Sequence, residues 1–296
     1  MRSSRSLLLV LILTLTWSCQ AQSGSPAPAG TNRVQTINFQ SKLVGAPLPY
    51  IVVLPPDYEE RSAKRVNYPV LYLLHGLGGS FENWTAKTRL KEYATQYRII
   101  VVTPEGSDGW YTDSATVATD KYETYLLQEL ICDVEQRFRA IRRREGRAIA
   151  GLSMGGYGAL KFGVKYPDKF VFAGSMSGAF DPTGRSETNP GFAWGFLRHS
   201  VFKVFGPEGD PARAANDLHR LFRYLPPGRI SSLPYLYFDC GTDDGFLNTN
   251  RELAAILRER KIPHEYRELP GDHSWVYWDQ RVREVLRVAA ERLAKQ

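Results

Sequence analysis

The stretch RAIAGLSMGGYGALKFG, residues 147–163, joins an apolar run to a helix-like segment through a serine flanked by glycines. Its middle, GLSMG at residues 151–155, is a G-x-S-x-G sequence between a predicted strand and a predicted helix. In that setting the pattern is typical of a tight turn that holds the serine hydroxyl above the edge of a sheet. A side chain at either flanking glycine would collide with the neighbouring strand or helix. The stretch therefore predicts an exposed, reactive hydroxyl on Ser153.

Short runs rich in β-formers alternate with longer helical segments along most of the chain. Two runs, VQTINF and PYIVVLPP, predict an opening antiparallel pair, and later strands are expected at VLYLLHG, RIIVVTPEG, RAIAGLS, FVFAGSMSG, LPYLYFDCG and HEYREL. Helices are expected at about residues 87–97, 120–138 and 250–260, directly after Ser153, and over the C-terminal segment. This alternation predicts an α/β fold, a mostly parallel twisted sheet with helices on both faces. Ligands of such sheets bind at the carboxyl ends of the strands.

A nucleophilic serine needs a base to accept its proton and a carboxylate to orient that base. In this fold class the acid and the histidine follow the serine in that order, each on a loop after a later strand. The segment LYFDCGTDDGF offers Asp243 and Asp244, and ELPGDHSWVYW offers His273 just before the last helix. We expect Asp244, three residues after the turn glycine, to be the acid, with Asp243 as the alternative. Of the histidines after Ser153, His273 alone stands at a suitable strand end.

The negative oxygen of a tetrahedral intermediate needs two hydrogen-bond donors. The backbone N–H of Met154, directly after the serine, is the first candidate. The second is expected in the loop HGLGG, residues 75–79, which follows an apolar predicted strand. Glycines in that loop allow the backbone to approach a carbonyl oxygen closely, and we expect the Leu77 N–H to donate.

With these residues the chain resembles the esterase D-like branch of the α/β-hydrolases, which includes S-formylglutathione hydrolases, tributyrin-type esterases, feruloyl and acetylxylan esterases, and mycolyltransferases. The matching segments are HGLGGSFENW, GLSMGGYGALK, DCGTDDGF and GDHSWVYW, and the similarity extends from about Val34 to the C-terminus. The resemblance implies the α/β-hydrolase fold and acyl transfer from an ester to water through an acyl-enzyme on Ser153. It also implies that the reaction uses neither a metal nor an organic cofactor.

The substrate is less well defined by the sequence. Residues 181–233 form an insertion that we expect to cover the site, and they contain no substrate signature. Several aromatic residues on loops could line an aromatic acyl or sugar pocket, or could equally serve ordinary packing. The candidates for substrate binding are Trp84, Trp110, Trp194 and Trp275.

The N-terminus reads as a secretory signal. Arg2 and Arg5 precede an apolar stretch at residues 7–17, which is too short to span a bilayer, and a run rich in Pro, Gly and Ser follows. We expect a signal peptide at residues 1–21, a flexible linker at 22–32, and a single catalytic domain at 33–296. Cleavage after Ala21 would release a secreted or periplasmic protein, whereas Cys19 leaves lipoprotein anchoring open.

Charge and cysteine content exclude some other classes. The formal net charge of +7 falls to about +5 when the two arginines of the signal leave, which is modest for 296 residues. The densest basic cluster, IRRREGR, stands at the end of a predicted helix, so we expect no nucleic-acid partner. Two cysteines after the signal, Cys132 and Cys240, define neither a zinc site nor a disulfide scaffold, although a bond between them stays open.

The sequence therefore predicts a secreted serine carboxylesterase that hydrolyses short-chain or aromatic acyl esters, feruloyl or acetyl, free or linked to plant polysaccharide. One alternative is an acyltransferase that moves the acyl group to a sugar hydroxyl, and another is a thioesterase similar to S-formylglutathione hydrolases. A non-catalytic glycan-binding module is a third, against which the complete set of serine, acid and histidine argues. The sequence does not determine the oligomeric state.

Overall fold

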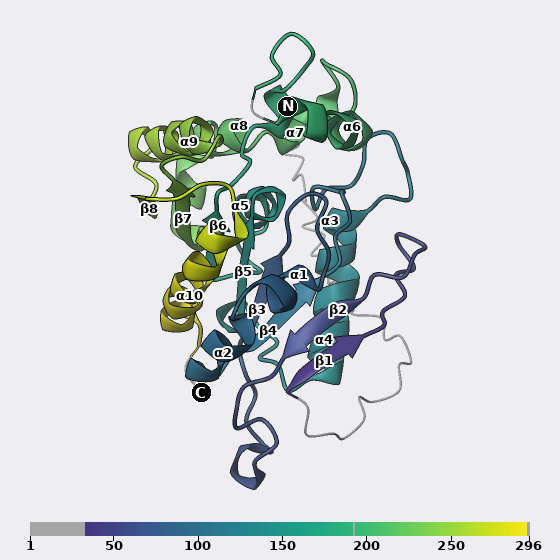
Figure 1. Cartoon of the computed structure of the whole chain (residues 1–296), viewed down its shortest axis with the longest axis vertical. Helices are drawn as coiled ribbons and strands as arrows, with labels where there is room; N and C mark the ends of the chain where they lie inside the picture. The colour runs from purple at the N-terminus through teal and green to yellow at the C-terminus, as the bar shows by residue number, and fades with distance from the viewer. Residues whose placement is uncertain (1–32, 192, 295–296) are drawn as a thin grey trace, which may run out of the picture.

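Eight strands form one sheet in the part of the chain that the structure, a computed structural model, describes: residues 33–191 and 193–294 (Figure 1). The strand order is β1-β2-β4-β3-β5-β6-β7-β8. The bounds are β1 (Val34–Ile37), β2 (Tyr50–Val53), β3 (Val70–Leu74), β4 (Ile100–Pro104), β5 (Arg147–Leu152), β6 (Phe172–Met176), β7 (Tyr235–Gly241) and β8 (His264–Leu269). The predicted signal peptide and linker, residues 1–21 and 22–32, lie outside the described residues.

The sheet is mostly parallel, as the alternation of elements predicts. β2 pairs antiparallel with β1 and with β4, and the remaining neighbours pair in parallel. The opening antiparallel pair expected from the sequence is thus confirmed. The central strands are continuous apolar runs such as VLYLL in β3, and they are buried along their whole length. Runs of this kind are typical of strands covered on both faces.

The helices that cover the sheet follow the strands in sequence. Their bounds are α1 (Asn83–Lys87), α2 (Leu90–Tyr93), α3 (Tyr122–Tyr125), α4 (Ile131–Arg137), α5 (Met154–Lys165), α6 (Trp194–Phe205), α7 (Pro211–Asn216), α8 (Leu218–Arg223), α9 (Leu247–Glu259) and α10 (Trp275–Arg292). A π-helical turn at Leu126–Leu130 joins α3 to α4. Among the described residues, no helix has both the length and the apolar character that a membrane crossing requires.

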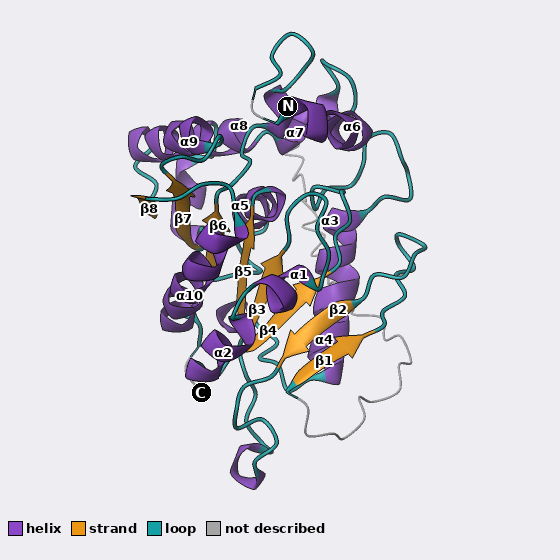
Figure 2. Ribbon diagram, in the orientation of Figure 1, coloured by secondary structure: helices purple, strands orange, loops and turns teal. Residues whose placement is uncertain are grey.

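Helices lie on both faces of the sheet (Figure 2). On one face Val282 and Leu286 of α10 belong to the same buried cluster as Leu71 and Leu73 of β3. On the other face α5, α9 and the helix that runs from α3 through α4 pack against the alternate side chains of the strands. Because successive side chains of a strand point to opposite faces, each central strand contributes to both cores.

The helix expected at about residues 87–97 is wrong in its bounds. The structure has two short helices there, α1 and α2, separated by Thr88 and Arg89, and the backbone of Thr88 is extended. The Thr88 hydroxyl donates to the Trp84 carbonyl (2.5 Å) and accepts from the Leu90 N–H (3.2 Å). The threonine side chain thus bonds to backbone groups on both sides of the break, which interrupts a continuous helix.

The insertion at residues 181–233 connects β6 to β7 and contains α6, α7 and α8. Figure 1 shows these helices gathered at one end of the molecule, with α6 and α7 at the top of the view. Leu197 and Val201 of α6 and Phe222 of α8 are buried in the same core as α5. The insertion is therefore packed onto the domain.

Cys240 lies inside β7 and is a buried free thiol. Cys132 and Cys240 therefore do not form a disulfide with each other, which resolves that open point of the sequence. Burial raises the pKa of the Cys240 thiol, so this side chain stays protonated and packs as a small apolar group.

Candidate active site

Ser153 stands between the last residue of β5 and the first residue of α5. Its backbone φ of 51° lies in the left-handed region, which is strained for a residue with a side chain. The Ser153 N–H donates to the carbonyl of Met176 at the end of β6 (3.0 Å), which ties the turn to the sheet. The local structure is thus the sharp strand-to-helix turn that the G-x-S-x-G pattern predicts.

The two glycines of the pattern make this turn possible. A Cβ atom at Gly155 would lie 2.6 Å from the carbonyl oxygens of Leu74 and His75 in and after β3. A Cβ atom at Gly151 would lie 2.4 Å from the carbonyl carbon of Gly155. These neighbours are backbone atoms, which cannot rotate away, so both positions exclude a side chain.

Ser153, His273 and Asp244 form a chain of hydrogen-bonding contacts. His273 Nε2 is 3.1 Å from Ser153 Oγ, and His273 Nδ1 is 2.9 Å from Asp244 Oδ2. The second carboxylate oxygen of Asp244 accepts the N–H of Phe246 (2.8 Å). With a carboxylate at Nδ1, that nitrogen carries the proton, and Nε2 is left to accept the serine proton.

Asp243, the alternative acid, is exposed, and its backbone N–H donates to the carbonyl of Gly271 (2.9 Å). Asp244 is 5% exposed. Of the two carboxylates that the sequence offered, the structure brings Asp244 to His273.

The acid loop and the histidine loop touch through two glycines. A Cβ atom at Gly241 would lie 2.2 Å from the carbonyl oxygen of Gly271. Gly271 itself has a φ of 140°, a conformation that residues with side chains rarely adopt. The close approach of these backbones brings the Asp244 carboxylate within reach of the His273 ring.

Asp244 stays ionised although it is buried. Burial raises the pKa of the carboxyl, but the hydrogen bond and charge of His273, together with the Phe246 N–H, outweigh it and hold the pKa below its usual range. A carboxylate fixed in this way stabilises a positive charge on the imidazole.

Aromatic rings hold the imidazole from two sides. The Phe246 ring centroid lies 5.1 Å from that of His273, and the Trp278 ring lies 4.9 Å away at an interplanar angle of 89°. Trp278 in turn packs against Trp275 at 5.1 Å. The side chain of His273 therefore has little freedom to leave the line between Ser153 and Asp244.

Met154 and Leu77, the two expected donors, come from two different segments next to Ser153. Met154 is the first residue of α5, so its N–H has no acceptor within the helix and lies at the positive end of the helix dipole. Leu77 belongs to the loop after β3 and lines the same cavity as Ser153. An Asp108 oxygen accepts the N–H of the next residue, Gly78 (2.7 Å), which fixes this loop.

A cavity of about 250 Å³ opens beside Ser153. Its wall is mostly apolar, and three of its residues come from the insertion, namely Ala193, Phe196 and Leu197. The rest of the wall is formed by Gly76, Leu77, Gly78, Gly79, Asn83, Lys87, Leu152, Ser153, Phe246, His273, Trp275 and Trp278. The insertion therefore covers one side of the cavity, as the sequence predicts.

Of the four tryptophans expected at the substrate, Trp275 alone lines this cavity. Trp110 is fully buried, donates to Ser200 Oγ (3.0 Å) and packs in the core. Trp84 is also fully buried, donates to the Leu74 carbonyl (3.1 Å), and supports Trp275 from behind at 5.6 Å. Trp194 packs against Phe202 at 5.9 Å. The expectation is corrected for these three because their rings are used in packing.

The sequence did not single out Lys87, Leu197 or Phe246 for the cavity, and it offered Phe196 and Trp278 only among the loop aromatics that could line a pocket. A signal existed for Trp278, which lies in the segment HSWVYW one helical turn after Ser274, the residue that precedes α10. Lys87 and Leu197 carry no such signal, because their position at the cavity depends on how α1 and α6 pack.

Comparison with known proteins agrees with the geometry. Residues 41–287 match the family model described as putative esterase. An acetyl esterase from Caldicellulosiruptor saccharolyticus is 29% identical over 252 residues, which cover 83% of this chain and 94% of the relative. Among solved structures, FphF, a fluorophosphonate-binding serine hydrolase of Staphylococcus aureus, aligns with a TM-score of 0.75 at 25% identity, over 87% of this chain and 98% of the other.

A solved ferulic acid esterase aligns with a TM-score of 0.72 at 28% identity, again over 87% of this chain and 98% of the other. These neighbours share the α/β-hydrolase fold, with a mostly parallel sheet of eight strands and helices on both sides. The family match covers well over half of the chain, and the sequence resemblance to esterases is thereby confirmed. The chain belongs to the putative esterase family and is a serine esterase.

Proposed function

We propose that this esterase is a secreted carboxylesterase for short-chain or aromatic acyl esters, with Ser153 as nucleophile, His273 as general base and acid, and Asp244 as the residue that orients and stabilises His273. The observation that carries the proposal is the pair of contacts from His273 to Ser153 Oγ (3.1 Å) and to Asp244 Oδ2 (2.9 Å). These distances are within reach for proton transfer to and from a positioned base.

In the first half of the reaction His273 Nε2 takes the Ser153 proton while Oγ forms a bond to the carbonyl carbon of the ester. The carbonyl electron pair moves to its oxygen, which the N–H groups of Leu77 and Met154 stabilise. The pair then returns, the bond to the alcohol oxygen breaks, and His273 gives that oxygen its proton. The products are a free alcohol and an acyl group on Ser153.

In the second half water replaces the alcohol. His273 Nε2 takes a proton from water as the water oxygen attacks the acyl carbon, and the same two N–H groups stabilise the second oxyanion. When the bond to Oγ breaks, His273 returns the proton to Ser153. The acid product leaves and the enzyme is regenerated, so every group used belongs to the chain, the ester or water.

The cavity supports the choice of acyl group. At about 250 Å³ and with a wall of aliphatic and aromatic side chains, it suits an acetyl, butyryl or single-ring aromatic acyl group better than a long chain. The similarity to an acetyl esterase and to a ferulic acid esterase points in the same direction. An ester linked to plant polysaccharide is the natural source for both acyl types, and secretion, expected from the signal-like residues 1–21, would bring the enzyme to it.

The experiment is an assay of the mature chain on 4-nitrophenyl acetate, butyrate and octanoate, methyl ferulate and acetylated xylan, with Ser153→Ala as the control. We expect turnover of the short-chain or feruloyl esters that falls by at least about a thousandfold in Ser153→Ala. Full activity of Ser153→Ala would overturn the proposal, and a faster rate on octanoate would overturn the acyl preference. Product analysis with added sugar reports on transfer: an acylated sugar as main product would make the enzyme an acyltransferase.

A further inference from the structure

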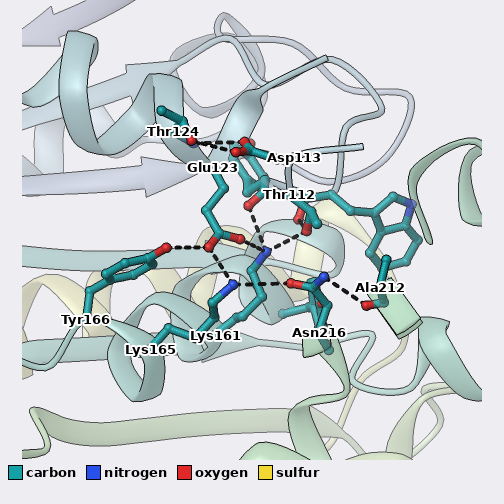
Figure 3. Close-up of polar contacts among 12 residues, drawn as sticks. Thr112, Asp113, Glu123, Thr124, Lys161, Lys165, Tyr166, Ala212 and Asn216 are labelled. Carbon is teal, nitrogen blue, oxygen red and sulfur yellow. Dashed lines mark hydrogen bonds and ion pairs between the residues drawn. The ribbon is translucent and has the colours of Figure 1, made fainter. Parts of the chain in front are cut away.

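Lys161 of α5 is fully buried behind the site, on a helix that begins directly after Ser153. Its ammonium donates to Glu123 Oε2 (2.6 Å), to Thr112 Oγ1 (2.5 Å) and to the backbone carbonyl of Tyr111 (2.9 Å). Figure 3 shows the side chain reaching from α5 toward Glu123 and Thr112. All three donors of the ammonium are therefore used, and they join α5 to α3 and to the loop after β4.

Glu123 compensates the charge of this buried lysine. Its other oxygen accepts the Tyr166 hydroxyl (2.6 Å) and pairs with Lys165 Nζ at 2.5 Å (Figure 3). Burial raises the pKa of the Glu123 carboxyl, but the two lysines outweigh it and lower the pKa to about 2. The carboxylate is thus ionised at neutral pH and holds the Lys161 ammonium in place, since an unpaired buried charge would be very costly.

The backbone that Lys161 binds is strained. Trp110 and Tyr111 have φ values of 51° and 48°, two consecutive residues with side chains in the left-handed region. Such a conformation is unfavourable for a residue with a side chain and persists only where the surrounding structure holds it. The bond from Lys161 to the Tyr111 carbonyl is one such restraint, and strain of this kind is concentrated near functional sites.

The loop that contains Trp110 and Tyr111 is also hydrogen-bonded to His75, the residue that follows β3. The Tyr111 hydroxyl donates to the backbone carbonyl of His75 (3.2 Å), and the Gly106 N–H donates to His75 Nε2 (2.9 Å). The Tyr111 ring leaves no room for a Cβ atom at Gly106 (2.4 Å) or at Gly158 of α5 (2.9 Å). Its position between loop and helix is therefore fixed on both sides.

His75 is the residue from which the loop with Leu77 begins. We propose that Lys161 and Tyr111 are positioning residues for the oxyanion site: Lys161 holds the strained turn, and the Tyr111 hydroxyl holds the His75 carbonyl and with it the direction of the Leu77 N–H. The inference rests on the proposed function, in which that N–H stabilises the oxyanion. Neither residue touches the substrate.

Two pairs of variants test this inference in the full chain. Tyr111→Phe and Tyr166→Phe each remove one hydroxyl that makes one hydrogen bond in this region, but the Tyr166 hydroxyl contacts Glu123 and not the loop. Lys161→Met and Lys165→Met each remove one ammonium from Glu123, but the second partner of Lys165 is Asn216 of α7, whereas Lys161 also bonds to the loop after β4. The readouts are kcat and KM on an aryl acetate, the Ki of an aryl trifluoromethyl ketone, and the urea midpoint.

A trifluoromethyl ketone adds the serine oxygen to its carbonyl carbon and leaves a negative oxygen, so its Ki reports on the oxyanion site. One donor of such a site is worth about a hundred- to a thousandfold in rate, and its displacement should lose part of that. We expect Tyr111→Phe to lower kcat and raise the Ki by on the order of tenfold, with KM unchanged, and Lys161→Met to do so more strongly. Tyr166→Phe and Lys165→Met should shift the urea midpoint while kcat and Ki stay within about twofold of the parent.

Because Tyr111→Phe removes a single oxygen, it keeps the test informative if Lys161→Met does not fold. Equal kcat and Ki in Tyr111→Phe and Tyr166→Phe would overturn the positioning role, whatever the stability of the variants. Ser153→Ala, measured in parallel, distinguishes failure of the proposed function from failure of the inference. Activity that survives Ser153→Ala would contradict the proposed function and, with it, the inference. Activity that depends on Ser153 but is unchanged in Tyr111→Phe would contradict the inference alone.

Discussion

His273 Nε2 lies 3.1 Å from Ser153 Oγ, although 120 positions separate the two residues in the chain. Ser153 follows β5 and His273 follows β8, and β6 and β7 lie between them in the sheet. Since β5 to β8 are parallel, their carboxyl ends meet at one edge. The histidine loop then has to cross back over that edge, which the contact between Gly241 and Gly271 allows.

Asp244→Asn should lower kcat by about a thousand- to ten-thousandfold, because an amide in place of the carboxylate no longer fixes the tautomer of His273. Asp243→Asn is the matched control and should stay within about twofold of the parent, since Asp243 is exposed. Steady-state kinetics on 4-nitrophenyl acetate at pH 8 measure both. An inactive Asp243→Asn variant together with an active Asp244→Asn variant would assign the role of the acid to Asp243 instead.

Gly155→Ala should destabilise the fold by about 1–3 kcal/mol and abolish most activity, because its Cβ would meet backbone oxygens of Leu74 and His75 at 2.6 Å. Gly195→Ala is the control: it lies within α6, and a Cβ atom there meets nothing within 4 Å. It should stabilise the helix by about 0.5–1 kcal/mol. Urea unfolding and activity assays compare the two, and an unchanged Gly155 variant would show that α5 can move away from β3.

Phe196→Ala should raise the KM for 4-nitrophenyl butyrate by about three- to tenfold with little change in stability. The Phe196 side chain lines the cavity, yet it is 64% exposed and so adds little to the core. Tyr224, which is 68% exposed and does not line the cavity, gives the control variant Tyr224→Ala. The same KM in all three proteins would mean that α6 does not contact the acyl group.

Lys87→Gln should lower the preference for anionic esters. Lys87 is the one lysine or arginine in the cavity wall, its ammonium lies 5.1 Å from the centre of the Trp275 ring, and no carboxylate in the described residues pairs with it. At an exposed position its attraction for an anion is worth about two- to fivefold in kcat/KM.

The matched substrates for that test are 4-carboxyphenyl acetate and its neutral analogue 4-carbamoylphenyl acetate. The ratio of their kcat/KM values should fall in Lys87→Gln and stay constant in Lys91→Gln, which changes an exposed lysine of α2 away from the cavity. Added salt should reduce the ratio in the parent enzyme. A ratio that does not depend on Lys87 would exclude this lysine from substrate selection.

Asp239→Asn should remove part of the pH dependence of stability. Asp239 is fully buried in β7, where it accepts the hydroxyls of Tyr237 and Tyr277, both at 2.8 Å. Burial raises the pKa of its carboxyl from its ordinary range to about 6. The folded state thus binds this proton more tightly than the unfolded state, so the carboxyl lowers stability as pH rises from about 4 to about 6.

The full difference is on the order of 3 kcal/mol above pH 6 and vanishes below pH 4. Urea unfolding of both proteins from pH 4 to pH 7 measures it as a change in the gap between their free energies of unfolding. A gap that stays constant over this range would mean that Asp239 does not titrate there in the folded protein.

Much of the site could be read from the sequence because its parts are local. A serine between two glycines, with a strand before and a helix after, specifies the turn, and a loop of glycines after a buried strand predicts where a second donor would lie. The order of acid and histidine after Ser153 followed from the fold class. The same local logic failed for Thr88, where a side-chain hydroxyl interrupts a helix that periodicity alone would continue.

The wall of the cavity depends on contacts between elements that are distant in sequence. Trp110 and Trp275 are both tryptophans next to predicted strand or helix ends, yet one is buried against Ser200 and the other lines the cavity. Nothing in either local sequence distinguishes them, because the difference arises from how α6 and α10 pack on the sheet. Lys161 is a similar case: in the sequence it is one lysine of a helix, and in the fold it joins three segments.

The sequence by itself determined the class of fold and predicted the candidate nucleophile, the candidate histidine and the two carboxylates considered for the acid, since each follows from residue types at short spacings beside strands. The tertiary structure alone decided that Asp244 contacts His273, which rings line the cavity, and that the buried Lys161 ammonium bonds to the loop after β4. These depend on distances of a few ångströms between separate segments, 29 positions apart for Asp244 and His273 and 120 for Ser153 and His273, which packing sets and local propensity does not.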